Sequence, residues 1–343
     1  MINIKTSDAA DVEDLLTSNG FEKFRAKQVF DWLKKGAVSF DEMSNLPLKL
    51  RIFLKENYMI PTAVIERRQT SSIDGTVKYL FRLPDGEFIE SVVMRYHHGC
   101  TICISTQVGC KMGCTFCATG KSGYARDLDA SEMLAQIEAA QRDLNIRIAN
   151  VVLMGMGEPF DNYDQVIRFL ELVSSEQSLN IGMRHITIST CGIVPRMYDF
   201  ADLMLQCGLS VSLHAPTDEL RSRTMPVNRR YPIAQLMDAC CYYVRKTKRR
   251  ITFEYAMISG VNDSDSHARQ LADLLQGMLC HVNLIPVNNV TGAGYHKSSL
   301  QRQHAFVKIL SLKGVNATVR RTLGSDIDAS CGQLKRNVTK GDD

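Results

Sequence analysis

Hydrophobic and polar positions follow three successive patterns along the 343 residues of this chain. From about residue 8 to 58, apolar residues recur at helical spacing, as in VEDLL and AKQVFDWLKK, and Pro47 interrupts the pattern. This spacing places apolar side chains on one helix face and predicts a small helical unit. From about 62 to 98, polar and apolar residues alternate around Asp74-Gly75 and Asp85-Gly86, which predicts a small antiparallel sheet with two tight turns.

Beyond residue 100, short β-branched runs alternate with amphipathic segments of helix length. The six runs are TICIST (101–106), NVVLMG (150–155), HITIST (185–190), LSVSLHA (209–215), ITFEYAMI (251–258) and VNLIPV (282–287). This alternation predicts an α/β fold whose parallel strands form a barrel-like or doubly wound sheet. We therefore expect an N-terminal helical accessory domain (1–60), a small antiparallel β region (61–99) and a core (100–343).

In parallel sheets, chemical groups gather where the strands end. The polar or glycine-rich tails of the predicted strands are therefore the candidate positions for a site: QVGCKMGC, GMGEP, STCG, SLHAP and IPVN.

Composition narrows the class of protein. With 45% hydrophobic and 23% charged residues, the chain resembles an ordinary globular protein. The acidic N-terminal stretch MINIKTSDAADVEDLL does not resemble a signal peptide, and no apolar run reaches membrane-spanning length. These features predict a cytoplasmic protein without a membrane partner. Eleven cysteines, an odd number, then favour free thiols, metal ligation or catalysis over a disulfide framework.

The net charge of +4 is only mildly basic and permits a nucleic-acid partner without requiring one. Basic residues also occur in three local clusters: Arg245, Lys246, Lys248, Arg249 and Arg250; Arg221, Arg223, Arg229 and Arg230; Arg320 and Arg321. A single run of this kind usually covers a solvated helix face or turn. The three together make a phosphate-binding surface a reasonable expectation.

The stretch GCKMGCTFCATG brings together Cys110, Cys114 and Cys117. Three thiolates from one loop suit an iron-sulfur cluster in which one iron stays open for another ligand. A structural zinc site would normally show a second pair of ligands, and no second pair of suitable spacing follows. Zinc with a distant fourth ligand remains the alternative at this point.

The CxxxCxxC spacing, with Phe116 directly before the third cysteine, resembles the signature of the radical S-adenosylmethionine (SAM) enzymes. That resemblance implies a 4Fe-4S cluster that chelates SAM, cleavage of SAM to a 5′-deoxyadenosyl radical, and a partial (βα)6 barrel. Four stretches carry a narrower resemblance to the rRNA adenine methyltransferases of the RlmN and Cfr type: CISTQVGCKMGCTFCATG, VVLMGMGEP, SLHAP and DIDASCGQL. It covers nearly the whole chain.

The narrower resemblance implies methylation of carbon 2 of an adenosine in 23S rRNA, with an adenosine of tRNA as a candidate second substrate. Cys331 would accept a methyl group from one SAM, and a second SAM per turnover would yield the radical. Cys103 would resolve the covalent enzyme-RNA adduct through a transient disulfide with Cys331, and Glu90 matches the proposed general base.

Other family positions carry over to cofactor and partners. The positions that would contact SAM are Gly157, Glu158, Ser189, Ser212, Leu213, His214 and Asn288. The resemblance also implies an electron donor such as flavodoxin or ferredoxin, action on 23S rRNA before the ribosome is fully assembled, and a monomeric enzyme.

Three alternatives stay open from the sequence. The first is methylation of carbon 8 of the same adenosine, the antibiotic-resistance activity of the Cfr type. The second is a noncatalytic, zinc-stabilised RNA-binding protein, which would leave Cys103 and Cys331 unexplained. The third is a radical enzyme that acts on a small metabolite.

Overall fold

The computed structural model describes residues 2–7, 9–288, 294–329 and 332–334. Among the predicted site residues, Cys331 lies outside this described part of the chain. None of the helices in the described ranges is both long and apolar enough to cross a membrane.

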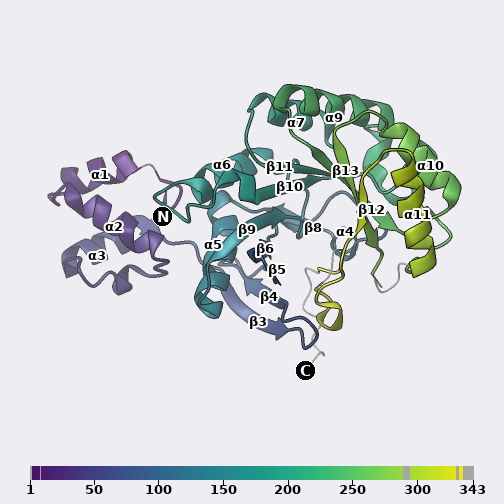
Figure 1. Cartoon of the computed structure of the whole chain (residues 1–343). Coiled ribbons are helices and arrows are strands. Elements are labelled where there is room, and N and C mark those ends of the chain that lie inside the picture. Colours follow the sequence, from purple (N-terminus) through teal and green to yellow (C-terminus); the bar gives the residue numbers. More distant parts are fainter. Residues whose placement is uncertain (1, 8, 289–293, 330–331, 335–343) are drawn as a thin grey trace.

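The N-terminal segment is helical, as its periodicity predicts. Its helices are α1 (Ala9–Ser18), α2 (Phe24–Lys34) and α3 (Leu48–Asn57), with a 3-10 turn at Phe40–Glu42. Val12, Val29 and Leu50 are among the residues that form its own buried core. The short strand β1 (Ile2–Asn3) pairs in parallel with β2 (Tyr58–Met59) and so joins the two ends of the unit. Figure 1 shows these helices to one side of the rest of the molecule.

One ten-stranded sheet organises the remainder, in the order β14-β13-β12-β11-β10-β9-β6-β5-β4-β3. The six predicted strands are confirmed as β6 (Gly99–Cys103), β9 (Ile148–Leu153), β10 (Ile186–Thr190), β11 (Gly208–Ser212), β12 (Ile251–Met257) and β13 (Cys280–Pro286). They are adjacent and parallel in sequence order, as in a partial (βα)6 barrel. A short strand that the sequence pattern did not reveal, β14 (Ala317–Val319), continues the sheet beyond β13.

The antiparallel strands belong to this same sheet. They are β3 (Val64–Thr70), β4 (Val77–Arg82) and β5 (Phe88–Tyr96), and the predicted Asp-Gly turns connect them. Gly75 and Gly86 have φ angles of 72° and 87°, which glycine adopts readily. Because β5 pairs with β6, the hairpins extend the barrel sheet and do not form a separate one.

Helices cover the outer side of the parallel strands, with α7, α9, α10 and α11 clearly seen there in Figure 1. The helices that follow the N-terminal unit are α4 (Ala118–Lys121), α5 (Ala130–Leu144), α6 (Tyr163–Ser174), α7 (Val194–Asp202), α8 (Asp218–Thr224), α9 (Ile233–Thr247), α10 (Asp265–Leu274) and α11 (Leu300–Leu312). Fully buried strand residues such as Val151, Ile188 and Phe253 belong to the large core that these layers enclose. Burial of this apolar surface is the main stabilising contribution.

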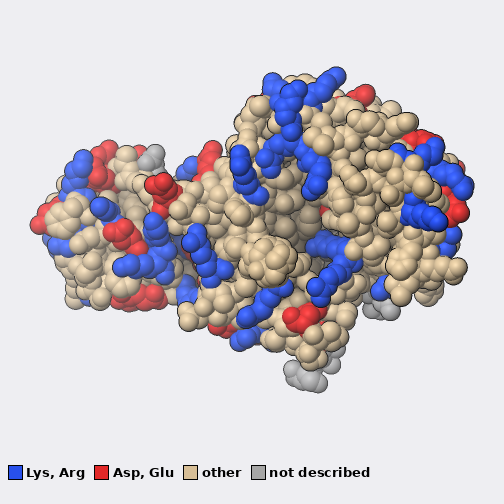
Figure 2. All heavy atoms as spheres, viewed as in Figure 1, with Lys and Arg blue, Asp and Glu red and all other residues tan. Residues whose placement is uncertain are grey.

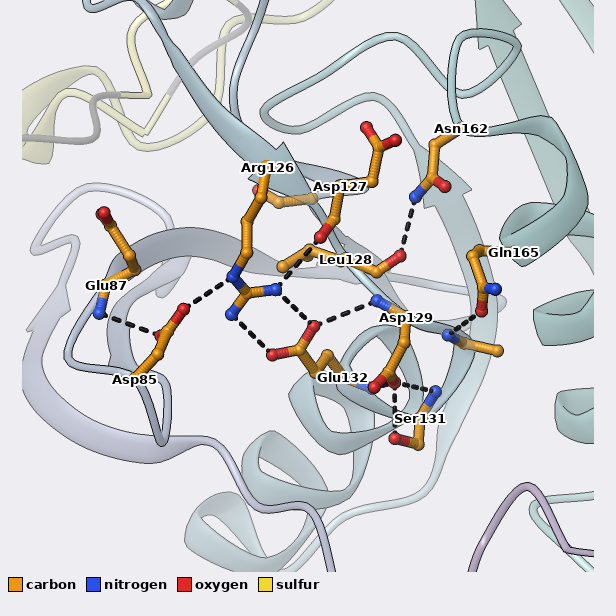
Figure 3. A network of polar contacts seen from close by, with 12 residues as sticks. Asp85, Glu87, Arg126, Asp127, Leu128, Asp129, Ser131, Glu132, Asn162 and Gln165 are labelled. Atoms are coloured by element: carbon orange, nitrogen blue, oxygen red, sulfur yellow. Dashed lines mark hydrogen bonds and ion pairs between the residues drawn. The ribbon is translucent and has the colours of Figure 1, made fainter. Parts of the chain in front are cut away.

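A charged network fastens the antiparallel strands to the barrel (Figure 3). Arg126 lies at the end of the two-stranded ribbon β7 (Gln107–Gly109) and β8 (Tyr124–Asp127). Its Nε donates to Asp85 Oδ2 at 2.6 Å, and its two terminal nitrogens donate to the Glu132 carboxylate at 2.8 Å each. Glu132 also completes a capping box with Asp129 at the start of α5. One guanidinium therefore joins the β4–β5 turn to the first barrel helix.

Candidate active site

The predicted cluster loop runs from β7 to α4 and carries Cys110, Cys114 and Cys117. Backbone contact shapes its start: the Cys110 N–H donates to Gly123 O at 2.9 Å. A Cβ on Gly109 would lie 1.9 Å from that same oxygen, so this close approach requires glycine. All three cysteines line a cavity of about 960 Å³, open to solvent, which we call the cluster cavity.

These thiols fit an iron-sulfur cluster. Burial raises the pKa of Cys110 to about 12 and also raises the pKa of Cys114. Ionised thiols here therefore need a cationic partner, which iron supplies. Among the described residues, no three His, Cys, Asp or Glu side chains converge as the ligands of one metal ion would. Three thiolates on one loop are a ligand set that iron-sulfur clusters use.

The turn after β9 forms one wall of the cluster cavity and holds Gly157 and Glu158. Gly157 has a φ of 107°, and a Cβ there would lie 2.8 Å from Gln107 N, so a larger residue would displace the backbone. Glu158 is 3% exposed and accepts hydrogen bonds from Thr190 Oγ1 and Cys191 N, both at 2.6 Å. Burial raises the pKa of Glu158, and these hydrogen bonds oppose the shift. The carboxylate thus links the ends of β9 and β10.

His214 lies just beyond β11 with a left-handed backbone, φ 57°, and lines the cluster cavity. Its Nδ1 accepts a hydrogen bond from Ala256 N at 2.8 Å, which assigns the proton of a neutral ring to Nε2. Burial, with the charge of Arg221, lowers the pKa of His214 to about 3. Phe116 of the cluster loop meets this ring edge-on at 4.7 Å between centroids. His214 is therefore a neutral hydrogen-bond donor beside the loop.

The other predicted SAM positions divide into two groups. Ser189, Ser212 and Asn288 line the cluster cavity. Leu213 lines neither this cavity nor the one described below: its side chain is buried in the core, while its backbone N–H donates to Glu254 O at 3.1 Å.

Arg221 does not lie on the surface with the basic run in which the sequence places it. It is fully buried and donates to Cys191 O at 2.6 Å, Ser212 O at 3.1 Å and Asn228 Oδ1 at 2.9 Å. Arg221 is therefore not part of the phosphate-binding surface that the three basic clusters together suggested. A guanidinium has five N–H donors, and here they satisfy acceptors at the ends of the strands, which a count of charges along the chain cannot reveal.

A second cavity of about 740 Å³, the thiol cavity, adjoins the first. Cys103, 8% exposed at the end of β6, lines it together with Val92 and Met94 of β5. The two cavities share lining residues: Cys117, Met154, Gly155, Ile285, Asn288, Arg320 and Gly332. The predicted resolving thiol therefore lines a cavity that Cys117 of the cluster loop also lines.

Glu90 lies on β5, two residues before Val92, so that alternation places both on the same face of the strand. It is 7% exposed and forms an ion pair with Lys78 Nζ at 2.9 Å. Glu90 lines neither cavity. The structure thus brings Glu90 to the strand face that forms the thiol cavity, two residues away from Val92 in its wall.

The C-terminal segment is attached on both sides. Gly332 O accepts a hydrogen bond from Ala118 N, and Leu334 O accepts one from Thr119 Oγ1, both at 2.8 Å. On the other side, Ser72 N donates to Asp326 Oδ2 at 2.9 Å. Residues Ala329, Gly332 and Leu334 line the thiol cavity. The described residues around the predicted methyl carrier are thus part of the wall of this cavity.

Comparison with known proteins identifies the family. A model described as the radical SAM superfamily matches residues 104–272, and one described as the ribosomal RNA large subunit methyltransferase N-terminal domain matches residues 2–60. The chain is 55% identical to the probable dual-specificity RNA methyltransferase RlmN of Alkaliphilus oremlandii, over 98% of each chain. The chain belongs to the RlmN family of radical SAM RNA methyltransferases.

Other comparisons agree with RlmN membership. The probable dual-specificity RNA methyltransferase RlmN of Thermoanaerobacter sp. (strain X514) is 52% identical, over 99% of each chain. The crystal structure of a radical SAM methyltransferase from Sphaerobacter thermophilus superposes with a TM-score of 0.94 at 45% identity, covering 98% of this chain and 100% of that one. Radical SAM membership confirms the predicted cofactors, a 4Fe-4S cluster and SAM, and replaces the zinc alternative.

Three polar residues that line the cluster cavity of this RlmN-family protein were missing from the predicted site. Cys191, Glu254 and Arg320 all line it. Cys191 belongs to the STCG tail, one of the strand tails predicted to hold site residues. Glu254 lies inside the run ITFEYAMI, where a single carboxylate between apolar residues is the one signal that could have identified it.

Proposed function

We propose that this protein methylates carbon 2 of an adenosine in 23S rRNA, and of an adenosine in tRNA as a second substrate. The names of its relatives, dual-specificity RNA methyltransferases, support this assignment. The observation that carries it is the pair of adjoining cavities, one lined by the three cluster cysteines and the other by Cys103. A radical source next to a nucleophilic thiol suits methylation of a ring carbon that ordinary SAM chemistry does not reach.

The proposed division of labour in the cluster cavity follows its lining. Cys110, Cys114 and Cys117 would hold the 4Fe-4S cluster. The SAM would be held by the predicted positions on the same wall: Gly157, Glu158, Ser189, Ser212, His214 and Asn288. Leu213 lines neither cavity and would instead support this wall, since its backbone N–H donates to Glu254 O. The bound cluster and SAM supply the carbon-centred radical that starts the reaction.

Three further residues would act on the methyl group and the ring. Cys331 would take the methyl group onto its sulfur and carry it to the adenine, forming the enzyme-RNA adduct. Glu90 would accept the proton that leaves the ring carbon. The Cys103 thiolate would then attack the Cys331 sulfur and break its bond to the methylene carbon, which would take up a proton to become the methyl group. Cys103 and Cys331 would be left as a disulfide that a cellular reductant reopens.

An RNA substrate must present an unstacked adenosine to this site, because the target carbon is enclosed in a duplex or stack. Figure 2 shows lysine and arginine side chains on the rim of the hollow near the middle of the molecule. Arg320 and Arg321 line the thiol cavity. We propose that these arginines face the phosphates next to the extruded base.

The remaining partners are part of the same proposal. An electron donor such as flavodoxin or ferredoxin would reduce the cluster, and the 23S rRNA would be met before full ribosome assembly. The enzyme would work as a monomer in the cytoplasm.

The decisive experiment uses anaerobic protein with SAM, a chemical reductant and a 23S rRNA fragment, followed by mass mapping of the methyl group. The wild type should produce 2-methyladenosine. Cys103→Ala should accumulate a protein-RNA adduct because nothing resolves it, and Cys331→Ala should give neither adduct nor product. Cys100→Ala is the matched control, since Cys100 lies on β6 but lines neither cavity, and it should behave as the wild type.

Two outcomes would contradict the proposal. A methyl group on carbon 8 would assign the Cfr-type specificity. Absence of methyl transfer to RNA by a protein with a full complement of iron would favour a small-molecule substrate.

A further inference from the structure

Lys78 is a buried lysine on the strand next to that of Glu90. It lies on β4, where every residue from Val77 to Phe81 is buried, and is itself 7% exposed. Its Nζ pairs with Glu90 Oε1 at 2.9 Å and also donates to Asp328 O at 3.3 Å. An ammonium can only donate, so both contacts use it as a fixed positive donor.

The ion pair of Lys78 is not explained by stability alone. In the described part of the chain, the pairs Lys5–Glu138 and Lys78–Glu90 have both side chains no more than 10% exposed. Apolar residues of similar volume are often at least as stabilising as a buried ion pair. Lys5 joins two units of the molecule, whereas Lys78 and Glu90 lie on strands that the backbone ladder already joins. A lysine at this position therefore calls for another reason.

The strand register places the pair beside the thiol cavity. Lys78 is the register partner of Val92, and Val92 is the register partner of Cys103. Val92 and Cys103 both line the thiol cavity. Register partners point to the same face of a sheet, and Glu90 shares that face two residues before Val92. The ion pair thus lies on the face that carries the predicted resolving thiol.

The surroundings hold both partners of the pair in place. Ser105 Oγ donates to Glu90 O at 2.7 Å, which fixes the backbone of the predicted base. On the other side, Asp328 precedes the predicted methyl carrier by three residues, and its Oδ1 accepts a hydrogen bond from Gln333 Nε2 at 2.9 Å. Lys78 therefore contacts both the strand of the predicted base and the segment of the predicted carrier.

The ammonium of Lys78 has a chemical consequence for Glu90. A carboxyl group accepts a proton only in its ionised form, which burial disfavours and a neighbouring positive charge favours. Lys78 supplies that charge. A charge-assisted hydrogen bond is also shorter and stronger than a neutral one, so it sets the direction in which the carboxylate points.

We propose that Lys78 is a positioning residue for removal of the ring proton: its ammonium keeps Glu90 ionised and oriented, and Asp328 O holds the ammonium there. This inference rests on the proposed function, in which Glu90 accepts the proton that leaves the methylated ring carbon. Lys78 acts only through the Glu90 carboxylate and takes no part in forming the radical.

Methylation of a 23S rRNA fragment that carries deuterium at carbon 2 of the target adenosine tests this role. In the first turnover, Lys78→Met should form 5′-deoxyadenosine as fast as the wild type but methylate the RNA about tenfold or more slowly. The ratio of methylation rates with hydrogen and with deuterium should exceed that of the wild type, because proton removal becomes the slow step. Lys5→Met, which breaks the other buried pair and lies outside both cavity linings, is the matched control and should keep the wild-type ratio.

A double variant separates action through Glu90 from a structural effect. Adding Lys78→Met to Glu90→Gln should slow methylation no further than Glu90→Gln alone, since the carboxylate through which Lys78 acts is already absent. The double variant contains neither buried charge, so this comparison decides the question if Lys78→Met alone fails to fold.

The positioning role would be overturned by a wild-type methylation rate in Lys78→Met, by slower methylation with an unchanged isotope ratio, or by a further loss in the double variant. Failure of the proposed function looks different, because the wild type itself would then methylate no RNA or methylate carbon 8. In the second case, RNA deuterated at carbon 8 tests Lys78 in the same way.

Discussion

His214 shows how one residue obtains its chemical state from its surroundings. The free side chain would be partly protonated near neutral pH, but burial and the nearby Arg221 lower its pKa from 6.5 to about 3. Its Nδ1 is occupied by the Ala256 N–H, so the imidazole can present only a donor to the cavity. Its role as a SAM contact remains a proposal, whereas its neutral form follows from the structure.

The lowered pKa predicts a pH dependence of stability. Between pH 6.5 and about 3 the unfolded chain binds a proton at His214 that the folded protein does not, so stability falls as the pH falls. From pH 7 to 5 this group should remove about 2 kcal/mol from the free energy of unfolding. In His214→Asn, the amide oxygen of asparagine can still accept a hydrogen bond from Ala256 N, and asparagine tolerates a left-handed backbone. Urea unfolding at several pH values should therefore show that the free energy of unfolding falls less steeply with decreasing pH in this variant than in the wild type. Parallel curves of this free energy against pH for the two proteins would contradict the lowered pKa of His214.

Single residues differed in how well the sequence predicted them. The spacing of Cys110, Cys114 and Cys117 is tied to one loop, so it remains visible in a linear sequence. The roles of Glu254 and Arg221 depend on neighbours from other strands, such as Ser212, and no local pattern encodes those neighbours. Nine of the predicted site residues therefore line the cluster cavity, but the sequence did not reveal the buried Glu254 carboxylate or the guanidinium that holds two strand ends.

At the scale of elements, Arg126 forms a polar link between the β4–β5 turn and helix α5 of the barrel. It contacts a turn, a ribbon and a helix start at once, as Figure 3 shows. Its side chain is 33% exposed and that of Glu132 is 10% exposed, so solvent screens the interaction only in part. Bidentate pairing with low exposure is the case in which an ion pair contributes measurably.

Replacement of this fastening should destabilise the protein. Arg126→Ala removes both terminal nitrogens and leaves the Glu132 carboxylate without its partner, so the free energy of unfolding should fall by about 2 kcal/mol. Lys313→Ala breaks an exposed pair with Asp273 and should change it by less than about 0.5 kcal/mol. Chemical denaturation compares the two variants. Equal effects would show that the network in Figure 3 is no stronger than a surface pair.

Element types were predicted better than their associations. Alternation and the Asp-Gly turns correctly indicated β3, β4 and β5, because both signals are local. The pairing of β5 with β6 was not predicted, since side-chain alternation describes the faces of a strand and says nothing of which edge finds a partner. The strand β14, only three residues long, has no pattern to recognise.

At the scale of the whole molecule, a buried ion pair joins the N-terminal segment to the barrel. Lys5 Nζ pairs with the Glu138 carboxylate of α5 and donates to Pro61 O at 3.3 Å. The two side chains are 4% and 8% exposed. Asn3 adds a hydrogen bond to Ser131 Oγ at 2.6 Å, also on α5. The helical unit is thus attached to the helix whose start Arg126 holds.

Removal of one partner of the Lys5–Glu138 ion pair should lower the free energy of unfolding more than removal of both partners. Lys5→Met leaves Glu138 buried without its counterion and should lower the free energy of unfolding by about 3 kcal/mol, whereas adding Glu138→Gln should restore part of it. Lys23→Met, which removes an exposed pair with Glu13, is the control and should have little effect. Chemical denaturation of the wild type, Lys5→Met, the double variant and Lys23→Met compares their free energies of unfolding. A double variant less stable than Lys5→Met would contradict this account.

The division of the chain into an accessory domain (1–60), a small β region (61–99) and a core (100–343) remains a prediction. The separate buried core of residues 4–58 favours an independent first unit. The strands of the other two segments belong to one continuous sheet from β3 to β14, which favours folding of these two segments as a single unit. The sequence shows three different patterns of hydrophobic and polar residues, but only the pairing of strands shows that the second and third segments share one β-sheet.

The register of β5 with β6 also constrains chain length. Val92 pairs with Cys103, and Glu90 precedes Val92 by two residues, so a single deletion between Glu90 and Val92 would turn one of them to the opposite face. The turn at Gly86 is not subject to this restriction, because a loop can lengthen without reversing a strand. Gains and losses of residues in the history of this sequence should therefore have been tolerated at the hairpin tips and eliminated within β5 and β6.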